Sequence, residues 1–223
     1  MDLEVRHAAT VILLRDGPDG LETLMLRRDS RLDFAGGHWV FPGGRIDEAD
    51  RDPARPDDEL ATAERAAIRE TVEEAGLHVR PGDMVAFSHW TPPAMAAKRY
   101  LTWFFLAAAP DGVVEIDQHE IREHQWMTPQ SALLRRNAGE IELSPPTWIT
   151  LEQLAVYVSV EDALAQARAA SPERFETRIA SVPGGIIAVY HGDAAYESGD
   201  PDAVGGRHRL WMLGDGWRYE RNC

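Results

Sequence analysis

The sequence predicts an α+β fold with a C-terminal extension. Short apolar and β-branched segments, typical of strands, stand on both sides of one long segment that has helix-start and helix-stop signals. The 223 residues suit one large domain, or one core domain with an appendage, and 44% hydrophobic residues are enough to build a core.

The first expected element is a hairpin. Strands are expected over residues 7–14 and 21–26, joined by a turn rich in Gly, Pro and Asp at residues 16–20. A polar loop then leads to a short strand at residues 39–41, which the following Pro-Gly-Gly ends.

One long helix is expected after an acidic loop. Residues 45–58 contain proline and several acids, so we expect an exposed loop there. Asp57 or Asp58 can cap a helix that runs to Ala75, because an aspartate side chain accepts hydrogen bonds from the first free N–H groups. Gly76 stands where a left-handed residue commonly ends a helix.

The second half of the chain is expected to contain both strands and helices. The expected elements are strands at 79–90 and 100–109, a loop into a short strand at 113–126, helices at 128–136, 146–157 and 160–170, and strands at 186–191 and 209–221. Asp215-Gly216 is a typical hairpin turn.

Charge and cysteine content exclude several classes of function. The 23 basic and 37 acidic side chains give a net charge of −14, which disfavours binding to a nucleic acid duplex, because such binding depends on cationic contacts to phosphates. The single cysteine, Cys223, excludes an intrachain disulfide. No segment approaches the roughly 20 apolar residues of a membrane span, and residues 1–6 lack an apolar signal core. We therefore expect a cytoplasmic protein without a membrane partner.

The segment from Arg69 to Leu77, Arg-Glu-Thr-Val-Glu-Glu-Ala-Gly-Leu, is the most informative part of the chain. Residues three and four apart share a helical face, so Glu70 faces Glu73 and Glu74. These like charges repel each other at the helix end that carries partial negative charge. A hard divalent cation with oxygen ligands would offset that cost, whereas an isolated cluster of this kind is more often a solvated helix face.

Together with Phe41-Pro42-Gly43-Gly44, the segment from Ala66 to Leu77 resembles the two halves of the Nudix box, the signature of the Nudix hydrolases. The resemblance implies a mixed β-sheet sandwiched between helices, with the box forming a loop–helix–loop. It also implies hydrolysis of a nucleoside diphosphate linked to another group, with Mg²⁺ or Mn²⁺ as cofactor. It favours a metal site over a solvated helix face.

A longer resemblance extends over about residues 5–160. Residues 34–44, followed by Ile46-Asp47 and Asp50, look like the acyl-coenzyme A diphosphatase branch of the family, whose members also have an extended linker inside the box. The resemblance implies a Nudix domain over residues 1–160, with an insertion at about 45–59. Residues 161–223 would then form a C-terminal helix and strand extension packed on the core.

The sequence departs from the family pattern at two points besides the insertion. Ala61 stands eight residues before Arg69, where the family has a glutamate; Glu59 or Glu64 are candidate substitutes. Asp33 stands four residues before Gly37, where the broader coenzyme A motif often has an arginine.

The box suggests roles for individual residues. Glu70 and Glu74, one turn apart, are the expected metal ligands, and Glu73 is expected to hold a second ion or help activate water. Gly43 and Gly44 would let the backbone approach the metal closely, with a carbonyl at Gly44 as a candidate ligand.

Further residues complete the expected site. Arg69 is expected to orient a box glutamate, and Gly76 is structural. Glu120, with Glu123 second, is a candidate for an additional ligand or general base, against the alternative of an ordinary surface loop. The neighbouring residues His119 and His124 are expected bystanders, because Mg²⁺ favours oxygen over imidazole.

Substrate-binding candidates lie mostly near the glycine-rich loop. Arginines that present planar donor forks to phosphates, including a 3′-phosphate, precede that loop: Arg27, Arg28 and Arg31. A solvated strand end is the alternative. Trp39 and Trp90 are candidates for stacking an adenine, although a tryptophan near a strand is more often core. Arg99 is a further candidate.

These inferences predict hydrolysis of coenzyme A or acyl-coenzyme A to 3′,5′-ADP and (acyl-)phosphopantetheine. The nearest alternative is the same chemistry on ADP-ribose, NADH or another nucleotide. An alternative of another class is a ligand-binding module that keeps the fold without turnover. A homodimer is expected, since symmetric dimers are common among soluble proteins.

Overall fold

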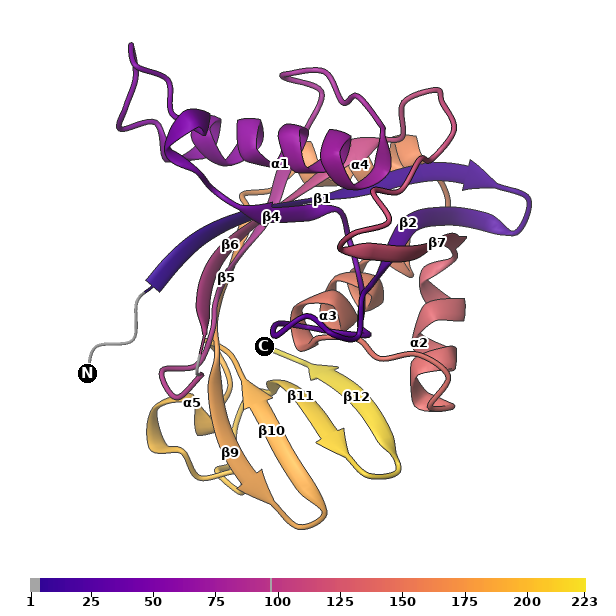
Figure 1. Ribbon diagram of the computed structural model, residues 1–223. Coiled ribbons are helices and arrows are strands. Elements are labelled where there is room, and N and C mark those ends of the chain that lie inside the picture. The colour runs from indigo at the N-terminus through magenta and orange to yellow at the C-terminus, as the bar shows by residue number, and fades with distance from the viewer. Residues whose placement is uncertain (1–4, 97) are drawn as a thin grey trace.

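Figure 1 shows the computed structural model, which describes residues 5–96 and 98–223. The prediction about an N-terminal signal core falls largely on residues 1–4, outside the described residues. A mixed sheet lies between helices, so the α+β prediction and the layered arrangement that the resemblance implies are confirmed. Among the described residues, no helix is both long and apolar enough to cross a membrane.

The large sheet contains eight strands in the order β3-β2-β1-β6-β5-β8, with β4 pairing to β1 and β7 to β2. Its strands are β1 (Val5–Gly17), β2 (Gly20–Arg28), β3 (Trp39–Val40), β4 (Gly43–Arg45), β5 (Val85–Thr91), β6 (Arg99–Ala108), β7 (Ile121–Met127) and β8 (Glu173–Glu176). Strand β1 runs antiparallel to β2 and β4 but parallel to β6. The expected N-terminal hairpin is therefore present, at the centre of the sheet.

Helix α1 (Glu59–Ala75) covers one face of the large sheet (Figure 1). Its start and end match the prediction: the Asp58 side chain accepts a hydrogen bond from the Ala61 N–H at 3.0 Å, and Gly76 has φ 67°. Small residues on α1 allow close packing on alternate residues of β1: Ala63, Ala66 and Ala67 against Ala9, Val11 and Leu13.

The opposite face of the sheet is covered by three further helices and a second sheet. The helices are α2 (Pro129–Asn137), α3 (Pro145–Leu154) and α4 (Val160–Ala169). Each begins after a Ser or Thr whose hydroxyl accepts a backbone N–H, which explains why they start where the sequence predicts.

The second sheet is antiparallel, in the order β12-β11-β10-β9. It contains β9 (Arg178–Val182), β10 (Gly185–Val189), β11 (His208–Leu213) and β12 (Gly216–Arg221), with the short helix α5 (Ala195–Ser198) between β10 and β11. The β11–β12 hairpin turns at Gly214-Asp215, and Gly216 has φ 137°. Asn137 bonds both the N–H and the carbonyl of Trp217, which joins this sheet to α2. The proposed domain division at residue 160 stays a prediction.

Several short elements differ from the sequence prediction. The structure adds β4, the short 3₁₀ helix η1 (Glu48–Asp50), β8, β9 and α5, none of which has enough apolar periodicity to be found from the sequence. The strand expected at 79–90 begins only at Val85. Its first part is a turn, because Pro81 cannot donate a backbone hydrogen bond and Gly82 has φ 85°.

Candidate functional site

Two glutamates of α1 lie against the glycine strand β4. The Gly43 N–H donates to Glu74 Oε2 at 2.9 Å. A Cβ atom added to Gly44 would lie 2.4 Å from the Glu70 carboxyl carbon, and one added to Gly43 would lie 2.5 Å from the Ala9 carbonyl oxygen. A side chain at position 43 would therefore push β4 away from the β1 backbone, whereas one at position 44 would displace the Glu70 carboxylate.

Glu74 is a buried carboxylate that is poorly neutralised. It is 5% exposed, and burial raises its pKa to about 8. The Gly43 hydrogen bond and the Arg28 charge lower the pKa by less, and the charges of Glu70 and Glu120 raise it further. Burial also raises the pKa of Glu70, although Arg69 opposes that shift. This arrangement favours the arrival of a positive charge.

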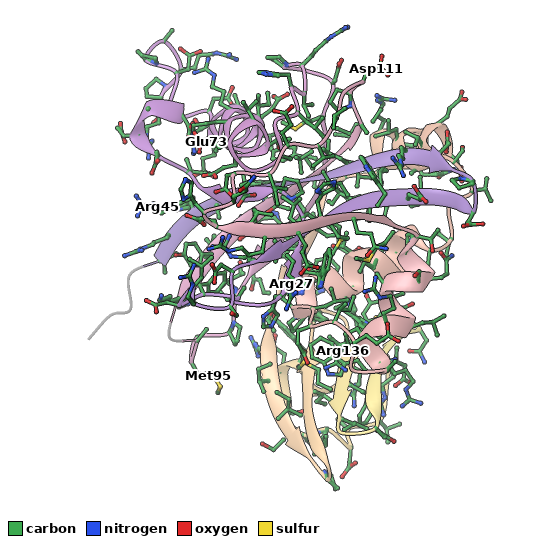
Figure 2. The ribbon with its side chains drawn as sticks, turned by 45° about the vertical axis from the view of Figure 1, so that its right-hand side comes forward. Arg27, Arg45, Glu73, Met95, Asp111 and Arg136 are labelled. Atoms are coloured by element: carbon green, nitrogen blue, oxygen red, sulfur yellow. The ribbon has the colours of Figure 1, made fainter. Side chains whose placement is uncertain are left out.

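Arg69 joins α1 to the segment that follows β4. Its Nη1 donates to Glu70 Oε1 at 2.9 Å and to Glu73 Oε2 at 3.2 Å, and its Nη2 donates to the Arg45 carbonyl at 2.9 Å. The Glu73 side chain is 57% exposed and is labelled beside α1 in Figure 2. Arg69 therefore orients Glu70, and Glu73 lies at the solvent edge of the cluster.

Asp50, for which the sequence predicts no role beyond the family resemblance, lies beside the box in the structure. Although residues 45–58 are expected to form an exposed loop, Asp50 is 5% exposed, and its two oxygens accept Arg69 Nε and Nη2, each at 3.0 Å. Burial alone would raise the Asp50 pKa, but the hydrogen bonds of Arg69 and Asp47 lower it overall. Asp50 thus fixes Arg69, which orients Glu70, and its oxygens are occupied by Arg69 and the Asp47 N–H. Glu64 does not substitute for the glutamate that Ala61 replaces, since it accepts the Gly82 N–H.

Arg28 connects the buried Glu74 to the loop before β7. Its Nη1 lies 3.6 Å from Glu74 Oε1, and its Nη2 donates to Glu120 Oε2 at 3.0 Å. Within the described part of the chain, Arg28 Nε is buried without a hydrogen-bond partner. Glu123 instead pairs with Arg27 at 2.6 Å, where both side chains are exposed. The structure thus brings Glu120, and not Glu123, to the glutamate cluster.

A cavity of about 400 Å³ has Arg28 in its lining, the residue that contacts Glu74 and Glu120, and is here called the arginine pocket. Its lining residues are Arg27, Arg28, Asp29, Ser30, Arg31 and Arg122. Buried Asp29 accepts Arg31 Nη2 at 2.7 Å and Arg122 Nε at 2.6 Å, and these contacts hold its pKa below the usual range. The pocket is cationic in a chain whose net charge is −14. Asp29 and Arg122 are absent from the sequence prediction because only the β2–β7 pairing brings Arg122 here.

The remaining substrate candidates lie elsewhere. Trp39 and Trp90 are buried in the core, where Trp90 stacks on Phe175 with ring centroids 3.9 Å apart. This burial supports the core role that was the alternative, so the prediction that these rings stack an adenine is corrected. Arg99 begins β6 opposite Val5 and does not line the arginine pocket.

The donor chemistry of the cluster fits a hard divalent cation. Carboxylate oxygens of Glu70, Glu74 and Glu120 repel one another, and oxygen is the ligand that Mg²⁺ and Mn²⁺ prefer. Among residues 5–96 and 98–223, no three Asp, Glu, His or Cys side chains stand close enough together to hold a metal ion as they are placed. Arg69 and Arg28 contact the glutamates instead.

Comparison with known proteins agrees with this geometry. The family model described as the NUDIX domain matches residues 5–149. A NUDIX hydrolase from Alicyclobacillus acidocaldarius has a TM-score of 0.68 at 23% identity, over 74% of this chain and 97% of that one. A MutT NUDIX hydrolase from Burkholderia pseudomallei has a TM-score of 0.50 at 22% identity, over 68% and 98%. The NUDIX domain of Shewanella oneidensis NrtR, complexed with ADP ribose, has a TM-score of 0.50 at 17% identity, over 75% and 90%. At these identities the likeness concerns the fold.

Proposed function

The chain belongs to the Nudix hydrolase family, whose members act on nucleoside diphosphate derivatives, and from this premise we propose that its substrate is coenzyme A or acyl-coenzyme A. The reaction adds water across the P–O–P bridge. One P–O bond of the bridge breaks, the water oxygen bonds to that phosphorus, and the bridging oxygen stays with the other half. The products are 3′,5′-ADP and (acyl-)phosphopantetheine, each with one phosphate from the bridge.

The proposal of coenzyme A as substrate rests on the arginine pocket. It places several guanidinium groups beside the glutamate cluster, with Arg28 only 3.6 Å from Glu74. Coenzyme A differs from ADP-ribose and NADH by a 3′-phosphate beyond its diphosphate. Arginine is suited to bind such a group, because its planar fork donates two parallel hydrogen bonds to phosphate oxygens.

We assign a different role in hydrolysis to each group of side chains in this site. Glu70 and Glu74 would hold Mg²⁺ or Mn²⁺, which when bound neutralises the diphosphate and lowers the pKa of water. Arg69, fixed by Asp50, keeps Glu70 against Gly44. Glu120 is the candidate general base, since it lies at the open end of the cluster with Arg28 as its partner. Arg27, Arg31 and Arg122 would bind the additional phosphate.

A substrate comparison tests the proposal. Purified protein with Mg²⁺ is given coenzyme A, dephospho-coenzyme A, ADP-ribose and NADH, and the products are identified by mass. Coenzyme A should have the highest kcat/KM, about 10-fold or more above dephospho-coenzyme A, as expected for one charged hydrogen-bonded contact of about 1.5–3 kcal/mol. Arg31→Ala should reduce that ratio, whereas the exposed control Arg55→Ala should not.

A preference for a substrate without the 3′-phosphate would reject the coenzyme A proposal. If ADP-ribose or NADH is cleaved best, the reaction class stands and the substrate changes. Binding of all four compounds without cleavage of any would identify the ligand-binding alternative.

A further inference from the structure

A second cavity, here called the insertion pocket, opens on the α1 side of the large sheet. It has a volume of about 400 Å³, within the range of small-molecule sites. Its walls come from the start of β1, the segment after β4, the N-terminal turn of α1 and Trp103 of β6. Trp103 is partly buried in the apolar layer beneath α1, and its ring contacts His89 at 4.5 Å between centroids.

The insertion pocket differs from the arginine pocket in its charge. Its lining has as many acidic as arginine side chains, and Arg45 bonds Asp47 at 3.1 Å while Arg51 bonds Glu48 at 3.0 Å. The lining of the arginine pocket has four arginines and one aspartate. Glu59 adds a carboxylate, while Trp103 and Ile46 add apolar surface. Such a lining offers both donors and acceptors around an apolar floor, without the excess positive charge that a phosphate needs. It suits a neutral chain that carries amide and hydroxyl groups.

Each pocket adjoins the glutamate cluster through one of its lining arginines. Arg28 of the arginine pocket contacts Glu74. Arg45 of the insertion pocket directly follows Gly44, which touches Glu70, and its carbonyl accepts a hydrogen bond from Arg69. Figure 2 shows Arg45 and Arg27 at separate places along the sheet. A diphosphate bound at the cluster can therefore extend one arm into each pocket.

We infer that the insertion pocket receives the neutral amide-bearing arm of the substrate, which is the pantetheine arm under the proposed function. The inference rests on that function and adds which end of the substrate lies where. The arm's carbonyl groups can accept from Arg45 and Arg51, its N–H and O–H groups can donate to Asp47 and Glu59, and its methyl groups can contact the Trp103 ring.

A truncated substrate isolates the contribution of this arm. The rate of cleavage is compared for coenzyme A and for the methyl ester of the 3′-phosphorylated ADP, which keeps both the diphosphate and the 3′-phosphate. In the wild-type protein, coenzyme A should have the higher kcat/KM. Trp103→Ala should reduce kcat/KM for coenzyme A about 10-fold, since an aromatic contact and its buried area are lost. The methyl ester should be cleaved within about two-fold of the wild-type rate.

Matched controls separate recognition from folding. Trp126→Ala changes another partly buried tryptophan of the same apolar layer, outside the pocket, and should leave the ratio of the two substrates unchanged. Arg51→Glu changes an exposed side chain of the pocket, so it should reduce the ratio even if Trp103→Ala does not fold. Arg55→Glu, another exposed arginine of the insertion, is its control.

The outcomes are distinguishable. An unchanged ratio in both pocket variants, or an equal loss for both substrates, would overturn the inference while leaving the diphosphatase intact. A lower ratio in Phe34→Ser alone would also overturn it, because the arm would then lie on the exposed Phe34–Tyr100 pair, where Phe34 is 48% exposed. No cleavage of either substrate by the wild-type protein would reject the proposed function together with the inference.

Discussion

Two buried carboxylates, one in each sheet region, have opposite surroundings. Asp193, beside the second sheet, accepts Arg209 Nε and Nη2 at 2.7 and 2.6 Å and the backbone N–H groups of His208 and Ala195, each at 2.8 Å. Burial alone would raise its pKa, but these bonds lower it overall. Glu74 has one N–H partner and a more distant arginine, and its pKa is raised to about 8.

This difference in hydrogen-bond partners and in pKa distinguishes an acid with a structural role from one with a functional role. A buried charge with all its hydrogen bonds made can hold two segments together, and removing its partner is costly. A buried carboxylate that is crowded by other carboxylates costs stability in the protein itself and becomes favourable only when a cation binds. We therefore expect changes at Asp193 to affect stability and changes at Glu74 to affect turnover.

Glu74→Gln should cause the largest effect. Loss of a metal ligand removes several kcal/mol of charge stabilisation, so kcat should fall by about 10³-fold or more. The melting temperature without metal should stay the same or rise, because glutamine is neutral as it stands, whereas Glu74, whose pKa is raised to about 8, must take up a proton to be buried at pH 7. Rate measurements and thermal unfolding check both parts. Turnover within 10-fold of wild type would show that Glu74 is not a ligand.

Asp193→Asn should show the reverse pattern. Breaking the buried pair should lower the free energy of unfolding by about 3–5 kcal/mol at pH 7, while kcat of the folded protein stays unchanged. Because the folded-state pKa of Asp193 lies below its ordinary value of 3.8, the stabilisation is complete above that pH and is lost as the pH falls through the folded pKa. Denaturant unfolding at pH 7 and pH 3 should show a smaller difference in acid.

Asp50→Asn should have an intermediate effect. Weaker orientation of Arg69 should raise the Mg²⁺ concentration needed for half-maximal rate about 10–100-fold, as outer residues around metal ligands commonly do. Asp52→Asn is the control, since Asp52 lies in the same insertion but bonds Arg55 and Arg65. Equal metal requirements in the two variants would remove Asp50 from the site.

Glu123→Gln should have the smallest effect. Its exposed pair with Arg27 is worth about 0–1 kcal/mol, so kcat/KM should change by less than about five-fold. Glu120→Gln, at the neighbouring loop position, should reduce kcat far more if Glu120 is the general base. A larger loss for Glu123 than for Glu120 would reverse that assignment.

The sequence predicts the parts of the site that one continuous segment contains. The helix from Asp58 to Ala75, its Gly76 end and the facing of Glu70 and Glu74 follow from local rules of spacing and capping. Those rules act between residues close in the chain, so they hold without knowledge of the fold.

The other parts depend on contacts between distant segments. In the sequence, Asp50 is one of several acids in a polar segment. Its role depends on a contact with Arg69, which lies 19 residues later in the chain. Arg122 reaches Asp29 across 93 residues through the β2–β7 pairing. The burial of Trp39 is likewise decided by packing between distant elements, which residue type alone does not specify.

The most direct test is the dependence of diphosphate cleavage on Mg²⁺ concentration in the wild-type, Glu74→Gln and Asp193→Asn proteins, assayed with coenzyme A under conditions where all three are folded. The wild-type and Asp193→Asn proteins should show the same saturable dependence and no turnover after chelation, and Glu74→Gln should show no turnover at any Mg²⁺ concentration. Metal-independent cleavage by the wild-type protein, or a normal Mg²⁺ response in Glu74→Gln, would contradict the assignment of the buried glutamates to a metal-dependent hydrolase site.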